Sequence, residues 1–346
     1  MTNIILEDIK SVVNDANINF KKLSDKTVLI TGATGIIGGY CVKVLGELNK
    51  TFDYNVNIYA TGRNIKKGLE LERLSGVTFM PADIRFSFEI ESKIKTQKID
   101  YIIHCAAIAD SAKALNEPVS VIDTELMGGR GMLDLALKKE TTGFLYASSM
   151  EAYGMLDNDS VTETDMGYLD VTNPRNSYPQ SKRMMETLCM CFSSQYKLNI
   201  NVLRLGMTFG AGNKEYLLSS KRLYARFAQS VINKKSIELH TEGASVVSLC
   251  YLTDAVRAIF LVLLSDSNGE IYNVASTSLS IRDFAKRIAT KFGVDFIVNP
   301  PPDVGSLGYY SDYKLSLNTE KIRKTGWKPQ VEDVEKMYER IIQEAK

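Results

Sequence analysis

Short apolar, β-branched runs recur through the first two-thirds of the chain, separated by stretches with helical spacing. The runs are too continuously apolar to have one solvent-facing side, which is typical of parallel strands covered by helices on both faces of a sheet. The pattern predicts an α/β fold of the doubly wound, Rossmann type. The expected strands are 27–32, 56–62, 77–83, 101–107, 143–149 and 200–206.

The first run leads into a glycine-rich turn, "VLITGATGIIGGY" at residues 28–40. Two of its glycines permit a tight turn and close backbone approach to a pyrophosphate, and the third permits close packing of helix on strand. The phosphates would lie at the positive end of the following helix. A tight turn without a ligand is the alternative, but the position after a strand and before a helix favours a dinucleotide site. Its expected residues are Gly32, Thr34, Gly35, Ile36, Ile37 and Gly38.

The ends of the following strands carry the other residues expected at the cofactor. "YATGRN" (59–64) has no acid for the ribose hydroxyls of NAD, and Arg63 could meet the 2′-phosphate of NADP or be only a solvated charge. Asp83 is placed to accept a hydrogen bond from the adenine amine, with a helix N-cap as the alternative. We therefore expect one NAD or NADP. The additional cofactor residues are Arg63, Asn64, Asp83, Ile84, Ala106 and Ala107.

"NSYPQSKRMMETL" (176–188) begins with polar residues and proline and then takes on helical spacing. In a helix, Tyr178 and Lys182 are four residues apart and share one face. A lysine ammonium beside a phenol, near an oxidised nicotinamide, lowers the pKa of the phenol from about 10 toward neutrality, so that it can accept an alcohol proton. An ordinary surface pair is the alternative, and the preceding glycine turn disfavours it.

"ASSMEAYG" (147–154) follows the fifth expected strand. It places two hydroxyls, Ser148 and Ser149, just ahead of Glu151. The acid is a candidate for proton transfer, with a helix-start carboxylate as the alternative. Met150 has a thioether, which cannot donate a proton.

The motifs "TGATGIIG", "ADI", "HCAA", "SSMEAYG", "YPQSK" and the late "TGWKP" together resemble the extended short-chain dehydrogenase/reductase superfamily, in particular its NAD-dependent sugar-nucleotide epimerases, dehydratases and decarboxylases. The resemblance covers nearly the whole chain and extends to bacterial capsule and lipopolysaccharide-pathway members, including proteins similar to UDP-glucuronate decarboxylase. It implies that Tyr178 is the base and that Lys182 orients the ribose. Ser148 or Ser149 would hydrogen-bond the reacting sugar hydroxyl, and His104 would be structural.

The resemblance also implies the chemistry. Tyr178 would deprotonate a hydroxyl, at C4 of the sugar, while hydride passes to a tightly bound nicotinamide, and the resulting ketone would acidify the proton at C5. Glu151 could remove that proton. Some dehydratases have an acid where Met150 stands, so we expect epimerisation or decarboxylation ahead of dehydration.

Three positions depart from the family pattern around the substrate diphosphate: Met207 for an Asn, Val247 for an Arg and Lys314 for another Arg. These changes remove charge-assisted hydrogen bonds worth about 1.5–3 kcal/mol each. The segment's own cations could compensate: Lys214, Lys221, Arg222 and Arg226. Two alternatives therefore stay open, a net NAD(P)-dependent reductase or dehydrogenase of a keto sugar or polyol, and a non-catalytic NAD(P)-binding regulator.

The remaining expectations concern organisation and partners. We expect an N-terminal helical extension (1–25), a Rossmann domain (26–205, which also receives about 246–275) and a smaller α/β substrate-binding region (206–245 and 276–346). Lys plus Arg (42) nearly balances Asp plus Glu (41), which argues against a nucleic-acid or membrane surface. Five cysteines without CxxC spacing and two histidines indicate neither disulfides nor a metal site, and fit a cytoplasmic protein. The resemblance implies a homodimer and a nucleotide-diphospho-sugar as substrate.

Overall fold

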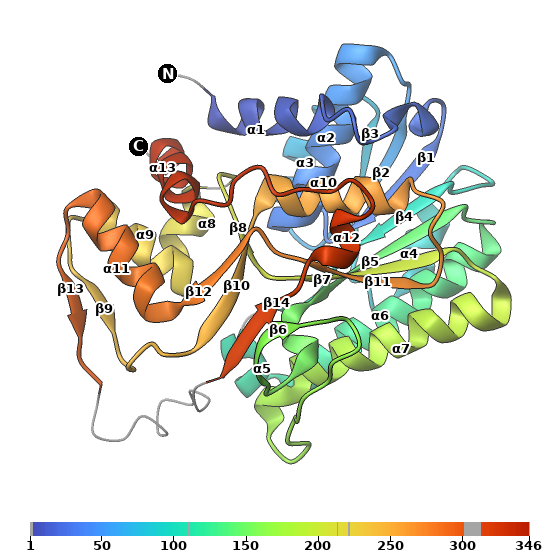
Figure 1. Cartoon of the computed structure of the whole chain (residues 1–346). Helices are drawn as coiled ribbons and strands as arrows, with labels where there is room; N and C mark the ends of the chain where they lie inside the picture. The colour runs from blue at the N-terminus through green and yellow to red at the C-terminus, as the bar shows by residue number, and fades with distance from the viewer. Residues whose placement is uncertain (1–2, 110, 213, 221, 301–312, 346) are drawn as a thin grey trace.

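The structure is a computed structural model that describes residues 3–109, 111–212, 214–220, 222–300 and 313–345. Its centre is a seven-stranded sheet in the order β11-β7-β5-β4-β1-β2-β3, with every pairing parallel (Figure 1). The order runs outward in both directions from β1 and β4, as a doubly wound fold requires. The predicted fold class and the six predicted strands are confirmed. The seven strands of the sheet, β11 being the one beyond those six, are β1 (Thr27–Thr31), β2 (Asn57–Gly62), β3 (Val77–Pro81), β4 (Tyr101–His104), β5 (Gly143–Ser149), β7 (Ile200–Leu205) and β11 (Glu270–Val274).

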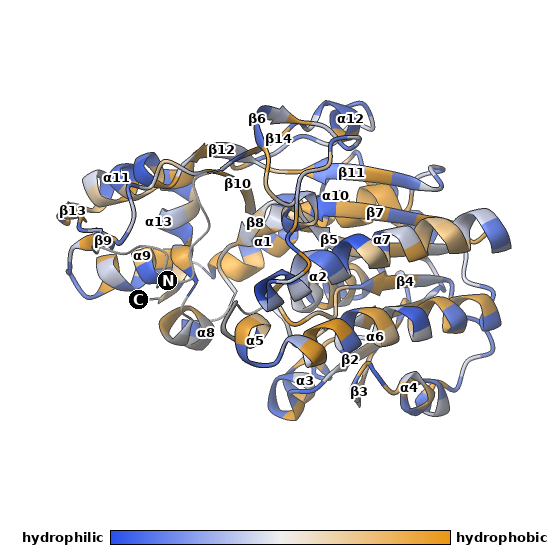
Figure 2. Ribbon diagram, turned by 90° about the horizontal axis from the view of Figure 1, so that it is seen from below, coloured by the Kyte–Doolittle hydropathy of each residue, from blue (hydrophilic) through white to orange (hydrophobic). Residues whose placement is uncertain are grey.

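Helices cover both faces of this sheet, which explains why its strands are apolar on both sides. One face buries a cluster with α2 (Ile36–Phe52), α3 (Ile65–Leu71) and α10 (Leu252–Leu263). The other face packs on α4 (Ser87–Lys93), α6 (Pro118–Lys138) and α7 (Ser177–Tyr196). Helices α6 and α7 run side by side on this face of the sheet, as Figure 2 shows.

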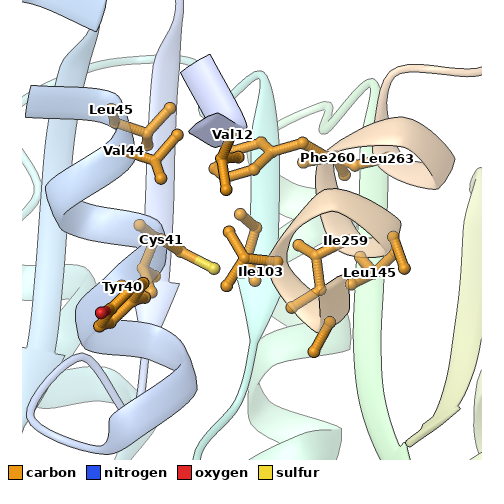
Figure 3. Packing of buried hydrophobic residues seen from close by; sticks show 14 of the residues in the cluster. Val12, Tyr40, Cys41, Val44, Leu45, Ile103, Leu145, Ile259, Phe260 and Leu263 are labelled. Atoms are coloured by element: carbon orange, nitrogen blue, oxygen red, sulfur yellow. The ribbon is translucent and has the colours of Figure 1, made fainter. Parts of the chain in front are cut away.

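The N-terminal segment is an integral part of the packing. Helix α1 (Ile4–Val13) contacts α2 and α10, and Figure 3 shows Val12 between residues of those two helices. The Asp8 carboxylate is buried and accepts hydrogen bonds from the Tyr251 hydroxyl (2.8 Å) and from Arg340 Nε (2.9 Å). A one-turn 3₁₀ helix, η1 (Phe20–Leu23), then leads into β1. The predicted helix of this segment is thus present, and it is fastened to residues from the far end of the chain.

A smaller region lies beside the carboxyl ends of part of the main sheet (Figure 1). One of its sheets has the order β12-β10-β14-β6, with β8 on β10, and a second pairs β13 with β9. A separate apolar cluster holds these strands to α9, α11 and α13. The strands are β6 (Asp157–Val161), β8 (Met207–Phe209), β9 (Ile237–Leu239), β10 (Val246–Tyr251), β12 (Thr277–Ser280), β13 (Phe296–Val298) and β14 (Lys314–Leu317). The helices are α8 (Lys214–Ser219), α9 (Leu223–Ile232), α11 (Ile281–Phe292) and α13 (Val334–Ala345).

The segment 246–275 connects the two regions. Its strand β10 belongs to the smaller sheet, whereas α10 and β11 pack with the large one. The late "TGWKP" motif follows α12 (Glu320–Arg323) and packs on α10: Trp327 Nε1 donates to the Asp254 carbonyl, and the Asp254 carboxylate accepts from the Gln330 amide. In the part of the chain that the structure describes, no helix is both long and apolar enough to cross a membrane.

Candidate active site

The glycine turn between β1 and α2 has the close approaches that its spacing predicts. Gly32 has φ +67°, and a Cβ there would lie 2.7 Å from the Cys105 carbonyl carbon. A Cβ on Gly38 would lie 2.5 Å from the Gly32 carbonyl oxygen. Helix α2 begins at its N-cap, Gly35, without a side-chain cap, which leaves backbone N–H groups at its positive end for an anion. The turn therefore fits a dinucleotide pyrophosphate.

The remaining residues expected at the cofactor lie at the carboxyl ends of neighbouring strands. Around the turn, Thr34, Ile36 and Ile37 are partly exposed, as are Ala106 and Ala107 after β4. Arg63 is exposed after β2, and Asn64 caps α3 by accepting from the Lys67 amide (3.0 Å). These positions share one edge of the sheet, and their contact with a cofactor stays a prediction.

Asp83 follows β3 and forms a two-point ion pair with Arg85, with Nε to Oδ1 at 3.0 Å and Nη2 to Oδ2 at 2.7 Å. The Arg85 guanidinium holds the pKa of Asp83 below its usual value. The N-cap of α4 is Phe86, so the helix-cap alternative for Asp83 is wrong. Ile84, the next residue, is buried.

Helix α7 brings Tyr178 and Lys182 together after a short 3₁₀ turn, η3 (Pro174–Asn176). The Lys182 Nζ lies 5.7 Å from the centre of the Tyr178 ring. Ser149, at the end of β5, lies beside the Tyr178 phenol and helps to lower its pKa. Ser149 and Tyr178 are far apart in the sequence, but both lie at the same edge of the sheet, one at the end of β5 and the other in the first turn of α7.

The protonation of Tyr178 is governed first by burial, which raises the pKa of its phenol above the usual value. The Lys182 ammonium and the Ser149 hydroxyl lower it, but they do not overcome burial. The Tyr–Lys spacing indicates the neighbouring cation but not this loss of hydration. The predicted lowering of the pKa assumes an oxidised nicotinamide beside the phenol, so it stays a prediction.

The two serines of "ASSMEAYG" have different partners. The Ser148 hydroxyl is buried and donates to Glu186 Oε1 at 2.5 Å. Glu186 in turn accepts from Nε and Nη2 of Arg204. Ser148 thus belongs to a buried polar network on α7 and β7, and the structure brings Ser149, rather than Ser148, to Tyr178.

Glu151 lies in η2 (Met150–Tyr153), the 3₁₀ turn that follows β5, and its side chain is exposed. Desolvation by the surrounding protein raises the pKa of Glu151, whereas the positive charges of Arg222 and Arg175 lower it. Met150 is buried with the apolar cluster of the smaller region. The Glu151 side chain therefore remains available for proton transfer, and Met150 serves packing.

The departures from the family pattern have structural roles of their own. Val247 is buried in the core of the smaller region, and Met207 packs against that core at the start of β8. Lys314 forms ion pairs with Asp157 (3.8 Å) and Asp159 (3.4 Å). Among the cations considered for compensation, Arg222 donates to the Ala109 carbonyl, and Lys221 lies outside the described residues.

Two residues at the site have no counterpart among the sequence predictions. Glu125 is buried on α6 and lies 3.1 Å from Lys182 Nζ. Arg183 donates to the backbone carbonyls of Ala152 (2.9 Å), Tyr153 (3.1 Å) and Gly167 (3.1 Å), so that it holds the turn that carries Glu151. A charged residue on the buried face of α6, in register with Val121 and Met132, was a signal for Glu125. Arg183 directly follows Lys182 in the sequence, and its position offers no such signal.

Residues 28–275 match the family described as "NAD dependent epimerase/dehydratase family". The chain is 25% identical over 276 residues to a dTDP-D-glucose 4,6-dehydratase of Dictyostelium discoideum, which covers 75% of this chain and 61% of that protein, so about three-fifths of this relative is matched. It is also 25% identical to UDP-glucuronic acid decarboxylase 6 of Arabidopsis thaliana, over 89% of this chain and 85% of the relative.

A solved structure with the same fold is the UDP-glucuronic acid 4-epimerase of Bacillus cereus in complex with UDP-glucuronic acid and NAD. The two share 18% identity with a TM-score of 0.74, covering 92% of this chain and 98% of the epimerase. The family match spans more than half of the chain and includes the glycine turn, Ser149, Glu151, Tyr178 and Lys182. The protein therefore belongs to the NAD-dependent epimerase/dehydratase family.

Proposed function

We propose that this protein converts a nucleotide-diphospho-sugar through a transient 4-keto sugar, as an epimerase, dehydratase or decarboxylase. The observation that carries the proposal is the meeting of Ser149, Tyr178 and Lys182 at one sheet edge, with Glu151 in the turn directly after Ser149. Relatives and fold neighbours named for each of these three reactions support the same range of chemistry.

The cofactor has a place in this arrangement. The turn formed by Gly32, Gly35 and Gly38 would hold the pyrophosphate of NAD, and Lys182 would hold its ribose. When bound, NAD supplies a hydride acceptor for C4 of the sugar and afterwards a hydride donor. A 2′-phosphate on the adenosine would meet the exposed Arg63, so NADP is the variant to test beside NAD.

The chain's own residues would carry out the proton transfers. Tyr178 takes the proton from the C4 hydroxyl while Ser149 hydrogen-bonds that oxygen, and Lys182 stabilises the phenolate. With a ketone at C4, the C5 proton becomes acidic, and Glu151 removes it. The raised pKa of Glu151 makes the carboxylate a stronger base, which suits a group that takes and returns a proton. Because Met150 is buried and cannot donate a proton, epimerisation or decarboxylation is favoured over a dehydration that needs a separate acid.

The proposal is tested by incubating the NAD-loaded protein with UDP-, dTDP-, GDP- and CDP-sugars and following the products by NMR. We expect one substrate to turn over without net change in NAD or NADH, and Tyr178→Phe to abolish the reaction. A stoichiometric change in NAD(P)H would instead support the net reductase or dehydrogenase. Failure of every sugar, with cofactor bound, would contradict the proposal and favour the non-catalytic regulator.

We also propose that the protein is a homodimer formed through α6 and α7. Large apolar side chains are exposed on these neighbouring helices, including Met127 (55% exposed) and Met184 (56% exposed). An interface between two copies of the chain would cover these side chains. A cytoplasmic location likewise remains a prediction from the sequence.

A further inference from the structure

The carboxylate of Glu125 and the ammonium of Lys182 form a buried pair between α6 and α7. Both side chains are almost inaccessible to solvent, and Oε1 of Glu125 lies 3.1 Å from Nζ of Lys182. Lys182 also donates to the Ala147 carbonyl at 2.9 Å. The Tyr146 hydroxyl donates to the same Oε1, while Oε2 of Glu125 is buried without a hydrogen-bond partner among the described residues.

A buried carboxylate with one unpartnered oxygen is costly in free energy unless a cation compensates it. Lys182 is the cation in contact with Glu125. Burial by itself lowers the pKa of the Lys182 ammonium, but the charge and hydrogen bond of Glu125 help to bring that pKa above its usual value. Glu125 therefore stabilises the charged form of Lys182.

The other titratable groups around Lys182 do not replace this carboxylate, and Glu186, the buried carboxylate one turn further along α7, is paired with Arg204. Burial raises the pKa of Cys105 to about 12 and lowers that of His104 to about 3, so both are neutral at physiological pH. Burial also keeps the Tyr146 phenol, whose ring centre is 4.7 Å from Nζ, and the Cys189 thiol protonated. Glu151 acts on Lys182 from an exposed position. Tyr178, on the same helix, is itself protonated because burial raises its pKa.

We propose that Glu125 is a positioning residue that keeps Lys182 charged and fixed in place for the cofactor ribose and Tyr178. The proposal rests on the proposed function only in assigning Lys182 to the cofactor. Burial disfavours the charged forms of both Lys182 and Tyr178. Without the charge of Glu125, Lys182 therefore loses its proton at a lower pH. The result is a neutral Lys182 amine beside a neutral Tyr178 phenol.

The test is the affinity for NAD as a function of pH, measured by isothermal titration calorimetry without any sugar. We expect the wild type to hold its affinity from neutral into mildly alkaline pH. Glu125→Gln, which has the same shape but no charge, should match the wild type at low pH and lose about tenfold as the pH rises, the factor expected for one lost charge-assisted hydrogen bond. Lys182→Met gives the reference level without the cation, which Glu125→Gln should approach at high pH.

Two further variants separate charge from packing. Tyr146→Phe removes a hydrogen bond from the same buried carboxylate but leaves its charge, so it should keep the pH dependence of the wild type. Glu125→Asp draws the carboxylate back by one methylene and should fall between the wild type and Glu125→Gln. It also supplies the test should Glu125→Gln fail to fold, which thermal melting will show.

A pH dependence in Glu125→Gln that is unchanged from the wild type, or a loss of NAD affinity by the same factor at every pH, would overturn the proposal. Either result would leave Glu125 as a packing residue only. Since no sugar is present, failure of the sugar panel leaves this measurement unaffected, and the two proposals can fail separately.

Discussion

At the scale of the residue, the site divides its chemistry between side chains in different surroundings. Burial raises the pKa of the Tyr178 phenol and the Lys182 ammonium opposes that shift, so the phenolate that takes the C4 proton depends on this cation. Glu151 reaches the surface, and desolvation by the surrounding protein raises its pKa. The proposed assignment of C4 to Tyr178 and C5 to Glu151 comes from the family resemblance.

Replacing Glu151 by Gln should separate the two steps. We expect exchange of the C5 proton to slow by roughly 10²- to 10⁴-fold, because the amide is no base, while oxidation at C4 continues. The measurement is deuterium incorporation from D₂O at C5 of the substrate found in the panel, followed by NMR. Met150→Leu, a change in the buried neighbour, is the control and should exchange at the wild-type rate. Wild-type exchange in Glu151→Gln would remove Glu151 from the mechanism.

Gly38→Ala should disrupt the cofactor turn. Its Cβ would meet the Gly32 carbonyl oxygen at 2.5 Å, and backbone has little freedom to give way. We expect a loss of about 1–3 kcal/mol in the free energy of unfolding and weakened NAD binding. Urea denaturation and calorimetry measure the two effects. Gly293→Ala is the control, because its Cβ meets nothing within 4 Å and only its φ of +67° opposes the change. It should lower stability without weakening NAD binding.

At the scale of the element, α7 supplies more than the Tyr–Lys pair. Directly after Lys182, Arg183 holds the carbonyls of Ala152 and Tyr153 within η2, and that of Gly167 in the following loop. All three acceptors are backbone carbonyls, so Arg183 fixes the path of the η2 backbone whatever side chains the turn carries. One helix thus sets the position of Tyr178 and of the turn that carries Glu151.

We expect Arg183→Met to loosen η2 while leaving α7 intact. Hydrogen exchange, followed by mass spectrometry, should quicken in residues 150–155 and stay unchanged in the second half of α7. The C5 step should slow by on the order of tenfold to a hundredfold, since small misplacements of a catalytic group are costly. Arg183→Lys retains the charge but lacks the forked donors, so its hydrogen exchange and its C5 rate should lie between those of the wild type and of Arg183→Met. Unchanged exchange in 150–155 would show that the turn holds itself.

At the scale of the whole molecule, contacts across the full length of the chain unite the two regions. The N-terminal helix α1 reaches Arg340 on α13 and Tyr251 on β10 through Asp8. The "TGWKP" segment packs on α10 through Trp327. These contacts seat the smaller region beside the edge of the large sheet where Ser149 and Tyr178 lie.

The proposed dimer interface on α6 and α7 is tested by the variant Met184→Arg. A charge placed in an apolar interface should convert a dimer to a monomer, which size-exclusion chromatography with light scattering detects. Val171→Arg is the matched control, because Val171 is also exposed and apolar but lies outside both helices. A wild type that is monomeric at all concentrations, or a Met184→Arg variant that stays dimeric, would contradict the proposed interface.

The sequence by itself determined the fold class, the six strands, the glycine turn and the Tyr178–Lys182 pair. Each follows from the spacing of residues close together in the sequence: continuous apolar runs, glycines three apart, and side chains four apart on one helix. It also indicated Glu151 as a candidate for proton transfer and Met150 as a side chain that cannot donate a proton. These features need no knowledge of which distant residues meet.

Only the tertiary structure decided which serine meets Tyr178, that Glu125 is the partner of Lys182, and that Arg183 holds η2. It also showed that burial opposes the lowering effect of Lys182 on the pKa of Tyr178. The physical reason is that hydrogen bonds and desolvation depend on neighbours far apart in the chain: Ser148 is 38 positions from Glu186, and Glu125 is 57 from Lys182. Local spacing specifies the elements, whereas packing specifies the charge and partner of each buried side chain.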